Sequence, residues 1–140
     1  METMTVKKVV TAFIRHGGRI LLLRRSRKVG SYRGKWAGVS GYLEQNEPLV
    51  QALTEIREET GLSETDVVLV KAGTPLEVAD HGLGVCWIVY PFLFETETPA
   101  KIQLDWEHVD MQWAAPDELG RLDTVPRLAE AYMQCRVDPA

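Results

Sequence analysis

The chain has only two cysteines, Cys86 and Cys135, and they form no closely spaced pair. Disulfide-stapled domains and zinc sites use several cysteines at short spacings, so neither class is indicated. The sequence also lacks any stretch approaching the roughly 20 apolar residues that span a bilayer. Its first residues lack the basic segment and the apolar run of a secretory leader. We therefore expect a reducing, cytoplasmic location and no membrane partner.

Charge of one sign is not in strong excess, because 20 acidic and 16 basic residues give a net charge of -4. This balance does not favour binding along a nucleic-acid backbone, and we expect no nucleic-acid partner. The composition is 45% hydrophobic and 26% charged over 140 residues, which is ordinary for a globular protein. We expect residues 1–140 to form a single domain.

Apolar runs and turn residues predict an α/β fold. Strands are predicted over residues 9–14, 20–23, 67–70, 85–94 and 109–113, and a short strand-and-turn segment that carries Gly38 and Gly41 is predicted over residues 36–43. Helices are predicted over residues 47–60 and 126–135, with a helical turn at 116–119. Gly61 is placed to end the first helix, and the apolar Leu62 follows at the position that often packs back on it. Strands interleaved with two substantial helices predict mixed sheets with helices packed outside.

The helix predicted over residues 47–60 carries three carboxylates in little more than one turn. Glu55, Glu58 and Glu59 stand at i, i+3 and i+4, so they share a face of the helix. Like charges this close repel by about a few tenths of a kcal/mol per pair. A hard divalent cation reverses that penalty, because it takes carboxylate oxygens as ligands. The pattern therefore predicts a Mg²⁺ site, with Mn²⁺ as the alternative, that acts on phosphates.

The segment 41–62 resembles the Nudix box, G-x5-E-x7-R-E-U-x-E-E-x-G-U, in which U is aliphatic. Gly41 and Glu47 match its opening, and residues 55–62 match its close. The resemblance implies a MutT-like Nudix fold, which is a mixed β-sheet sandwiched between α-helices. It also implies that Glu55, Glu58 and Glu59 are metal ligands. In the family the residue before the box glycine gives a backbone carbonyl to the metal, and Ser40 can do so here.

The box departs from the family pattern at its arginine. Six residues separate Glu47 from the arginine position, where the family has seven, and Thr54 occupies that position. In the family the arginine commonly helps to orient a box carboxylate. Arg57 is a poor substitute, because it points roughly 200° around the helix from Glu55. The departure bears on catalytic efficiency and substrate more than on metal binding.

The resemblance also points to residues outside the box. Glu107 stands six residues before Trp113, a spacing similar to that of a carboxylate with which Nudix hydrolases often bind metal or activate water. His108 is a further candidate, for which the alternative is a surface or capping histidine. The basic stretch over residues 24–35 is typical of a solvated loop, and Arg24 and Arg25 are its members expected to bind substrate phosphates.

The implied activity is Mg²⁺-dependent hydrolysis of the phosphoanhydride bond of a nucleoside diphosphate linked to another moiety. A nucleoside triphosphate, normal or modified, cleaved to nucleoside monophosphate and pyrophosphate is the leading substrate class. ADP-ribose or a nucleotide sugar is the second. A non-catalytic Nudix module that binds a nucleotide is the rival; Thr54 motivates it, and the three box carboxylates oppose it. An isopentenyl-diphosphate isomerase is poorly supported, because neither cysteine lies near the box. A homodimer stays open.

Overall fold

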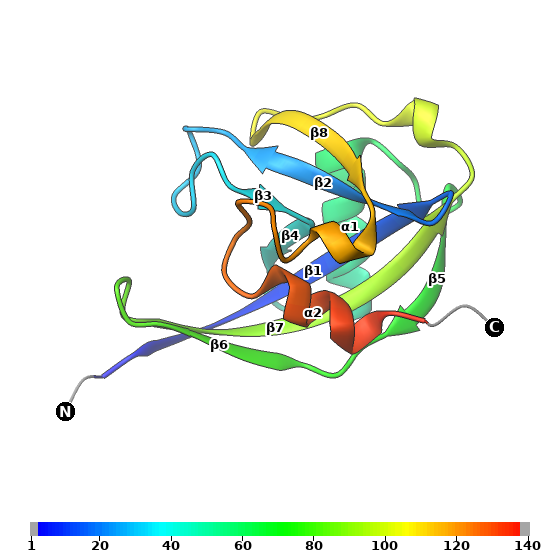
Figure 1. Cartoon of the computed structure of the whole chain (residues 1–140). Coiled ribbons are helices and arrows are strands. Elements are labelled where there is room, and N and C mark those ends of the chain that lie inside the picture. Colours follow the sequence, from blue (N-terminus) through cyan, green and yellow to red (C-terminus); the bar gives the residue numbers. More distant parts are fainter. Residues whose placement is uncertain (1–2, 138–140) are drawn as a thin grey trace.

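The computed structural model describes residues 3–137, which form a mixed eight-stranded β-sheet with a helix on each face (Figure 1). The strands are β1 (Thr5–His16), β2 (Arg19–Arg25), β3 (Trp36–Ala37), β4 (Val39–Tyr42), β5 (Val67–Ala72), β6 (Leu76–Asp80), β7 (Val85–Thr96) and β8 (His108–Ala114). The helices are α1 (Pro48–Thr60) and α2 (Leu128–Cys135), with short 3-10 helices at Pro99–Lys101 and Pro116–Glu118. The predicted fold class is confirmed. Over this described range no helix is long and apolar enough to cross a membrane.

Strand β1 organises the sheet by pairing with three other strands. It runs parallel to β7 and antiparallel to β2 and β4. Strand β8 extends the sheet from β2, and β5 and β6 extend it from β7. Side chains alternate across a strand, so Val10 and Ala12 of β1 pack with Ile56 of α1, whereas Phe13 packs with Leu128 of α2. The core therefore lies in two layers, one under each helix.

The predicted elements are confirmed in outline, but several strands are longer than predicted, the segment 36–43 is divided into β3 and β4, which pair with β2 and β1, and one strand was missed. The hairpin strands extend to residues 5–16 and 19–25. Strand β6 was not predicted, because its five residues carry only a short alternation of apolar and acidic side chains. It forms because β7 offers it a full antiparallel partner from Asp80↔Val85 to Leu76↔Val89.

Helix α1 ends where the sequence predicts. Gly61 has φ 76°, a left-handed conformation that glycine adopts without a steric penalty, and its N–H donates to the Arg57 carbonyl at 3.0 Å. Leu62 is fully buried in the same apolar layer as Ile56. This ending places Glu58 and Glu59 in the last turn of the helix.

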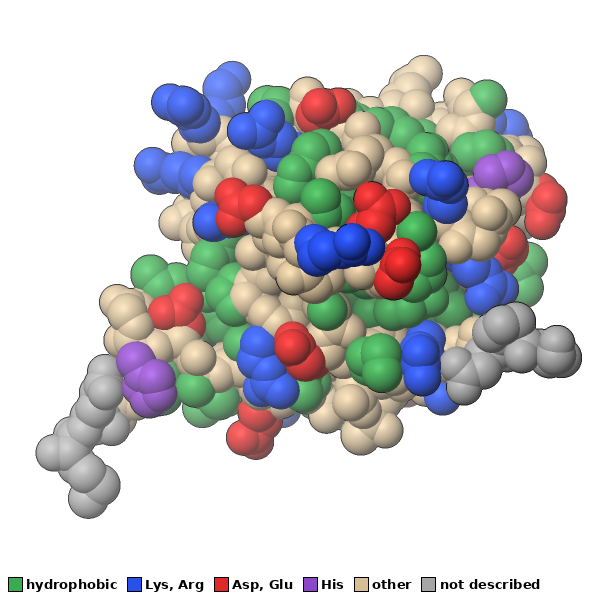
Figure 2. Space-filling view, in the orientation of Figure 1, with side chains coloured by type: hydrophobic (Ala, Val, Ile, Leu, Met, Phe, Trp, Pro, Cys, Tyr) green, Lys and Arg blue, Asp and Glu red, His purple; other side chains and the backbone are tan. Residues whose placement is uncertain are grey.

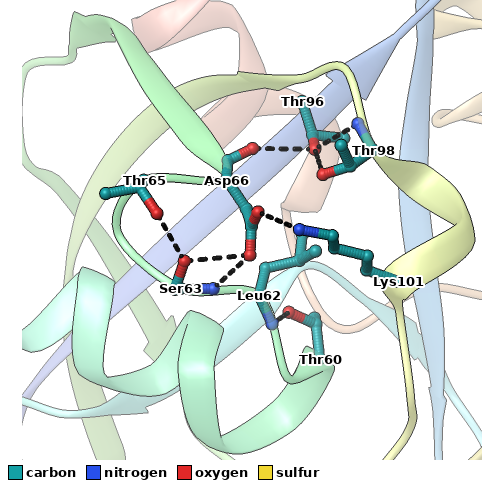
Figure 3. Close-up of polar contacts among 8 residues, drawn as sticks. All are labelled: Thr60, Leu62, Ser63, Thr65, Asp66, Thr96, Thr98 and Lys101. Atoms are coloured by element: carbon teal, nitrogen blue, oxygen red, sulfur yellow. Dashed lines mark hydrogen bonds and ion pairs between the residues drawn. The ribbon is translucent and has the colours of Figure 1, made fainter.

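A polar cluster fixes the chain between α1 and β5 to the segment that follows β7 (Figure 3). The Asp66 carboxylate accepts from the backbone N–H of Ser63 at 2.8 Å and lies 3.1 Å from Lys101 Nζ. The Thr96 hydroxyl donates to the Asp66 carbonyl at 2.9 Å. These contacts join the two connections that flank β5 and β7, and so hold the C-terminal end of α1 against the sheet.

Candidate active site

An open cavity of about 280 Å³ is lined by residues of β1, β4, β7, the second half of α1 and the start of α2. Its lining has an acidic part and an aromatic and apolar part. The acidic part comprises Glu44, Glu55, Glu58 and Glu107. The other part comprises Tyr32, Tyr42, Val78, Trp87, Val89, Val125, Pro126 and Leu128, and two cations, Arg25 and Arg127, also line the cavity. A ligand that fills this cavity needs two different ends. One end must be anionic, so that a bound cation can bridge it to the carboxylates, and the other must be flat or apolar.

Glu59 lies buried behind the acidic part, with 1% of its surface exposed. Its Oε1 lies 3.4 Å from the backbone N–H of Ser40 and 3.4 Å from Nε2 of His108. Its Oε2 is buried and has no hydrogen-bond partner among the described residues. A buried polar atom without a partner costs stability. Such an atom is typical of a site where a bound ligand supplies the missing partner.

The neighbouring carboxyl of Glu55 disfavours ionisation of the Glu59 carboxyl. Gln51 Nε2 donates to Glu55 Oε1 at 3.0 Å. Burial raises the pKa of Glu55 above its usual value, and burial together with the contact and the charge of the neighbouring Glu55 carboxyl raises the pKa of Glu59 well above its own. The negative charge of Glu107 acts in the same direction on both. These groups therefore hold protons more tightly than ordinary glutamates unless a cation compensates their charge.

Gly41 provides the space that the Glu55 side chain occupies. A Cβ at this position would overlap the carboxyl group of Glu55. The backbone of Gly41 is held in place by the pairing of β4 with β1, in which it lies opposite Val10. Glycine is thus required here for close approach between strand β4 and a side chain of helix α1.

The donor chemistry of the site fits a hard divalent cation. The available atoms are carboxylate oxygens, one of them buried and unpartnered, and a cation reverses the repulsion between Glu55 and Glu59. No group of three or more His, Cys, Asp or Glu side chains that could hold a metal ion is present in residues 3–137. Mg²⁺ commonly takes only one or two carboxylates and completes its shell with waters and substrate phosphates. Glu55 and Glu59 interact with each other, whereas Glu58 lines the cavity as an exposed residue.

The structure separates the two arginines that the sequence singled out. Arg25 lines the cavity, and its Nε donates to the Ser31 carbonyl at 2.9 Å. Arg24 is exposed, is absent from the lining, and donates to the Gly34 carbonyl at 3.2 Å. Figure 2 shows basic side chains gathered at the corner formed by the loop between β2 and β3. Most of the basic stretch is therefore solvated, as predicted.

A β-bulge at the start of β8 directs Glu107 and His108. The pairing of β8 with β2 shifts register where Arg24 lies opposite Asp110 and Arg25 lies opposite His108, which leaves Val109 as an extra, exposed residue. Bulges of this kind redirect side chains near functional sites. Glu107 lines the cavity, and His108 is buried. The alternative of a surface histidine is therefore wrong.

Tyr32, Tyr42 and Trp87 form an aromatic wall that was not predicted from the sequence. Trp87 Nε1 donates to the Tyr32 hydroxyl at 2.9 Å, and that hydroxyl donates to Asp80 Oδ2 at 2.6 Å. Burial and the Asp80 contact raise the pKa of Tyr32 to about 12, so it stays a donor. The alternation of Trp87 and Val89 along β7 was the signal that could have placed both on one face.

Two strained residues also lie in the cavity wall. Within residues 3–137 the non-glycine residues with positive φ are Tyr32, at 52°, and Arg127, at 58°, and both line the cavity. Arg127 Nη1 donates to the Glu77 carbonyl of β6 at 2.9 Å. Strained backbone of this kind is concentrated at binding sites, and sequence patterns give no sign of it for tyrosine or arginine.

The fold and the site define the class of the protein, which is that of the pyrophosphohydrolases. The family model described as NUDIX domain matches residues 5–135. The chain therefore belongs to the Nudix family, and the predicted recognition is confirmed. Nudix hydrolases act on small-molecule nucleotides and generally use divalent metal ions.

Several solved structures share this fold. The MutT protein from Methanosarcina mazei Go1 is 22% identical with a TM-score of 0.73, over 93% of this chain and 92% of that chain. The MutT NUDIX hydrolase from Burkholderia pseudomallei is 25% identical with a TM-score of 0.70, over 94% and 99%. The Ap4A hydrolase of C. elegans is 18% identical with a TM-score of 0.71, over 91% and 93%.

Proposed function

We propose that the protein hydrolyses a nucleoside triphosphate, normal or modified, to nucleoside monophosphate and pyrophosphate, with Mg²⁺ or Mn²⁺ as cofactor. The cavity that joins a group of carboxylates to an aromatic wall carries this proposal. A nucleotide has the matching two ends, a polyphosphate and a flat base. A volume of about 280 Å³ lies at the small end of ligand pockets, which favours one nucleoside over two.

The residues of the cavity have distinct roles in this proposal. Glu55 and Glu59 hold the metal ion, with Glu58 and the Ser40 carbonyl as further ligands. A bound Mg²⁺ supplies charge neutralisation on the phosphates and a template for the attacking water. Arg25 binds a phosphate oxygen, because it is the cation of the basic stretch that reaches the cavity.

Glu107 is the proposed general base. It lines the cavity, and its charge acts on both Glu55 and Glu59, so it lies close to the two proposed metal ligands. The oxygen of water bonds to phosphorus, the phosphoanhydride P–O bond breaks, and the proton of the water passes to the Glu107 carboxylate. The aromatic wall stacks against the face of the nucleobase of the substrate.

A substrate panel tests this proposal directly. Phosphate and pyrophosphate release is measured with Mg²⁺ over nucleoside triphosphates, dinucleoside polyphosphates, ADP-ribose and nucleotide sugars, with Glu59→Gln as the matched control. We expect turnover of a triphosphate that is lost on chelation and in the variant. Silence across the panel, combined with Mg²⁺-dependent thermal stabilisation by one nucleotide, would instead establish a binding module.

A further inference from the structure

His108 lies buried between two carboxylates that come from different parts of the chain. Its side chain is 1% exposed. Nδ1 lies 2.8 Å from Asp105 Oδ1, in the connection before β8, and Nε2 lies 3.4 Å from Glu59 Oε1, on α1. The three residues form a chain of polar contacts from the surface of that connection to the centre of the acidic site.

The contacts of Glu59 divide its two oxygens into different roles. Oε1 faces the Ser40 N–H and His108 Nε2, whereas Oε2 has no hydrogen-bond partner among the described residues. A carboxylate held at one oxygen cannot rotate freely about its terminal bond. The contacts at Oε1 therefore fix the direction in which Oε2 points.

The imidazole itself is held at its other nitrogen. A ring that bonds only one partner can turn about its own torsions, but Asp105 engages Nδ1 and so fixes the orientation of the ring and the position of Nε2. The β8 bulge contributes as well, because it places His108 in the interior while Val109 stays exposed. Backbone geometry and a side-chain contact thus determine the same ring position.

We propose that His108, anchored by Asp105, is a positioning residue that orients Glu59 so that its Oε2 is presented as a metal ligand. This inference rests on the proposed metal-dependent function. It gives the site a support that the helix does not supply, because the Thr54 hydroxyl donates to the Val50 carbonyl of its own helix at 3.0 Å. The residue that holds Glu59 in place is instead His108, the first residue of β8.

The test measures the affinity of the nucleotide-free protein for Mn²⁺, with electron paramagnetic resonance as the method of detection. His108→Phe keeps the ring volume and removes both nitrogens, so we expect Mn²⁺ affinity to fall by about 10- to 100-fold, as is typical when the partner of a metal ligand is lost. His108→Gln keeps an N–H donor and should stay within a few-fold of wild type. Asp105→Ala should weaken Mn²⁺ binding in the same direction, because it frees the ring.

The matched control is His16→Phe. His16 is a half-buried histidine whose Nδ1 lies 2.8 Å from the Thr96 carbonyl, and among the described residues no hydrogen bond or ion pair joins it to Glu59. We expect its Mn²⁺ affinity to equal that of wild type. Equal affinity in His108→Phe would overturn the inference and leave the metal-dependent function intact. Absence of Mn²⁺ binding in the wild-type protein would overturn both.

A measurement on the unmodified protein covers the case in which His108→Phe does not fold. Ring-nitrogen NMR of the wild-type histidines is recorded during a Mg²⁺ titration. We expect the His108 Nε2 signal to shift in proportion to metal occupancy, because Glu59 Oε1 shares its charge with the bound cation, while the His16 signals stay fixed. A His108 signal that does not move at saturating Mg²⁺ would overturn the inference.

Discussion

Single residues at this site are held in environments that favour function over stability. Glu59 is almost fully buried, one of its oxygens has no hydrogen-bond partner in the described structure, and its pKa is raised well above the usual range. Each of these features costs folding free energy when no cation is present. Departures of this kind from ordinary packing rules are expected where a ligand completes the structure.

The first prediction concerns Glu59→Gln. We expect turnover to fall by about two to four orders of magnitude, on the scale of losing a transition-state contact of several kcal/mol. We expect the melting temperature without metal to stay equal or to rise, because the neutral amide removes the repulsion with Glu55. Steady-state kinetics and thermal denaturation are measured together. A fall in both activity and melting temperature would assign Glu59 a structural role.

The second prediction separates Arg25 from Arg24. Arg25→Gln should lower kcat/KM by about tenfold or more, because a charge-assisted bond to a phosphate contributes about 1.5–3 kcal/mol. Arg24→Gln removes the same charge from the adjacent residue and should leave kcat/KM within about twofold, because Arg24 is outside the cavity lining. Equal losses in the two variants would show that general basic charge, and not a cavity contact, binds the phosphates.

At the scale of elements, the end of α1 and the strand β4 combine to form the acidic site. Gly61 ends the helix in a left-handed conformation, and Gly41 leaves room for a side chain from that helix. The two glycines therefore have different roles. Gly61 allows the helix to end, and Gly41 allows α1 to approach the sheet. The bulge in β8 adds the third element, because it turns Glu107 and His108 toward this junction.

The third prediction uses these glycines as a pair. Gly61→Ala should reduce the free energy of unfolding by about 1–2 kcal/mol, the cost of a left-handed conformation for a residue with a Cβ, and leave kcat nearly unchanged. Gly41→Ala should lower kcat strongly, because the new methyl group displaces the Glu55 carboxyl. Chemical denaturation and steady-state kinetics separate the two effects. An active Gly41→Ala variant would show that Glu55 does not need its present position.

The fourth prediction concerns the cluster in Figure 3. The Ser63 N–H and then Lys101 hold the pKa of Asp66 below its usual value. A lowered folded-state pKa stabilises the protein above the unfolded value of about 3.9, and this stabilisation disappears as the pH falls through the folded value. Asp66→Asn should therefore lower the melting temperature by a few degrees at pH 6–7, and the difference should shrink below about pH 4. A pH-independent difference would show that packing, not charge, is responsible.

At the scale of the whole molecule, one sheet carries both apolar layers and also one wall of the cavity. Val9 and Thr11 of β1 line the cavity, while Val10 and Ala12 of the same strand belong to the core under α1. The aromatic wall is tied to β6 through Tyr32 and Asp80. Ligand binding is thus coupled to the global stability of the fold, because the strands that line the cavity are also those that build the core.

The fifth prediction follows from this coupling. A ligand that binds only the folded state stabilises it by about 2.7 kcal/mol at a concentration of 100 Kd. We expect Mg²⁺ and a non-hydrolysable nucleoside triphosphate together to raise the melting temperature more than the sum of their separate effects. Glu59→Gln should lose this synergy. Additive shifts in the wild-type protein would show that metal and nucleotide bind independently.

Much of the fold could be predicted from local signals in the sequence. The helix over residues 47–60, its stop at Gly61 and the two-helix, mixed-sheet class depend on periodicity and on glycine conformation, which neighbouring residues determine. Strand β6 could not be predicted in this way, because its stability comes from hydrogen bonds to β7 rather than from its own composition. Elements with strong local preferences, such as the helix that ends at Gly61, could therefore be predicted from the sequence. Strand β6, which depends on β7 as its partner, could not.

The same division applies to the site. Helical geometry places Glu55, Glu58 and Glu59 on one face of a helix, so this arrangement could be predicted from their spacing. The tertiary structure sets the burial of Glu59 and the exposure of Glu58, since burial depends on what β4 and β8 place against the helix. It also decided that His108 meets Glu59, through a bulge that breaks the strand alternation on which sequence reasoning relies.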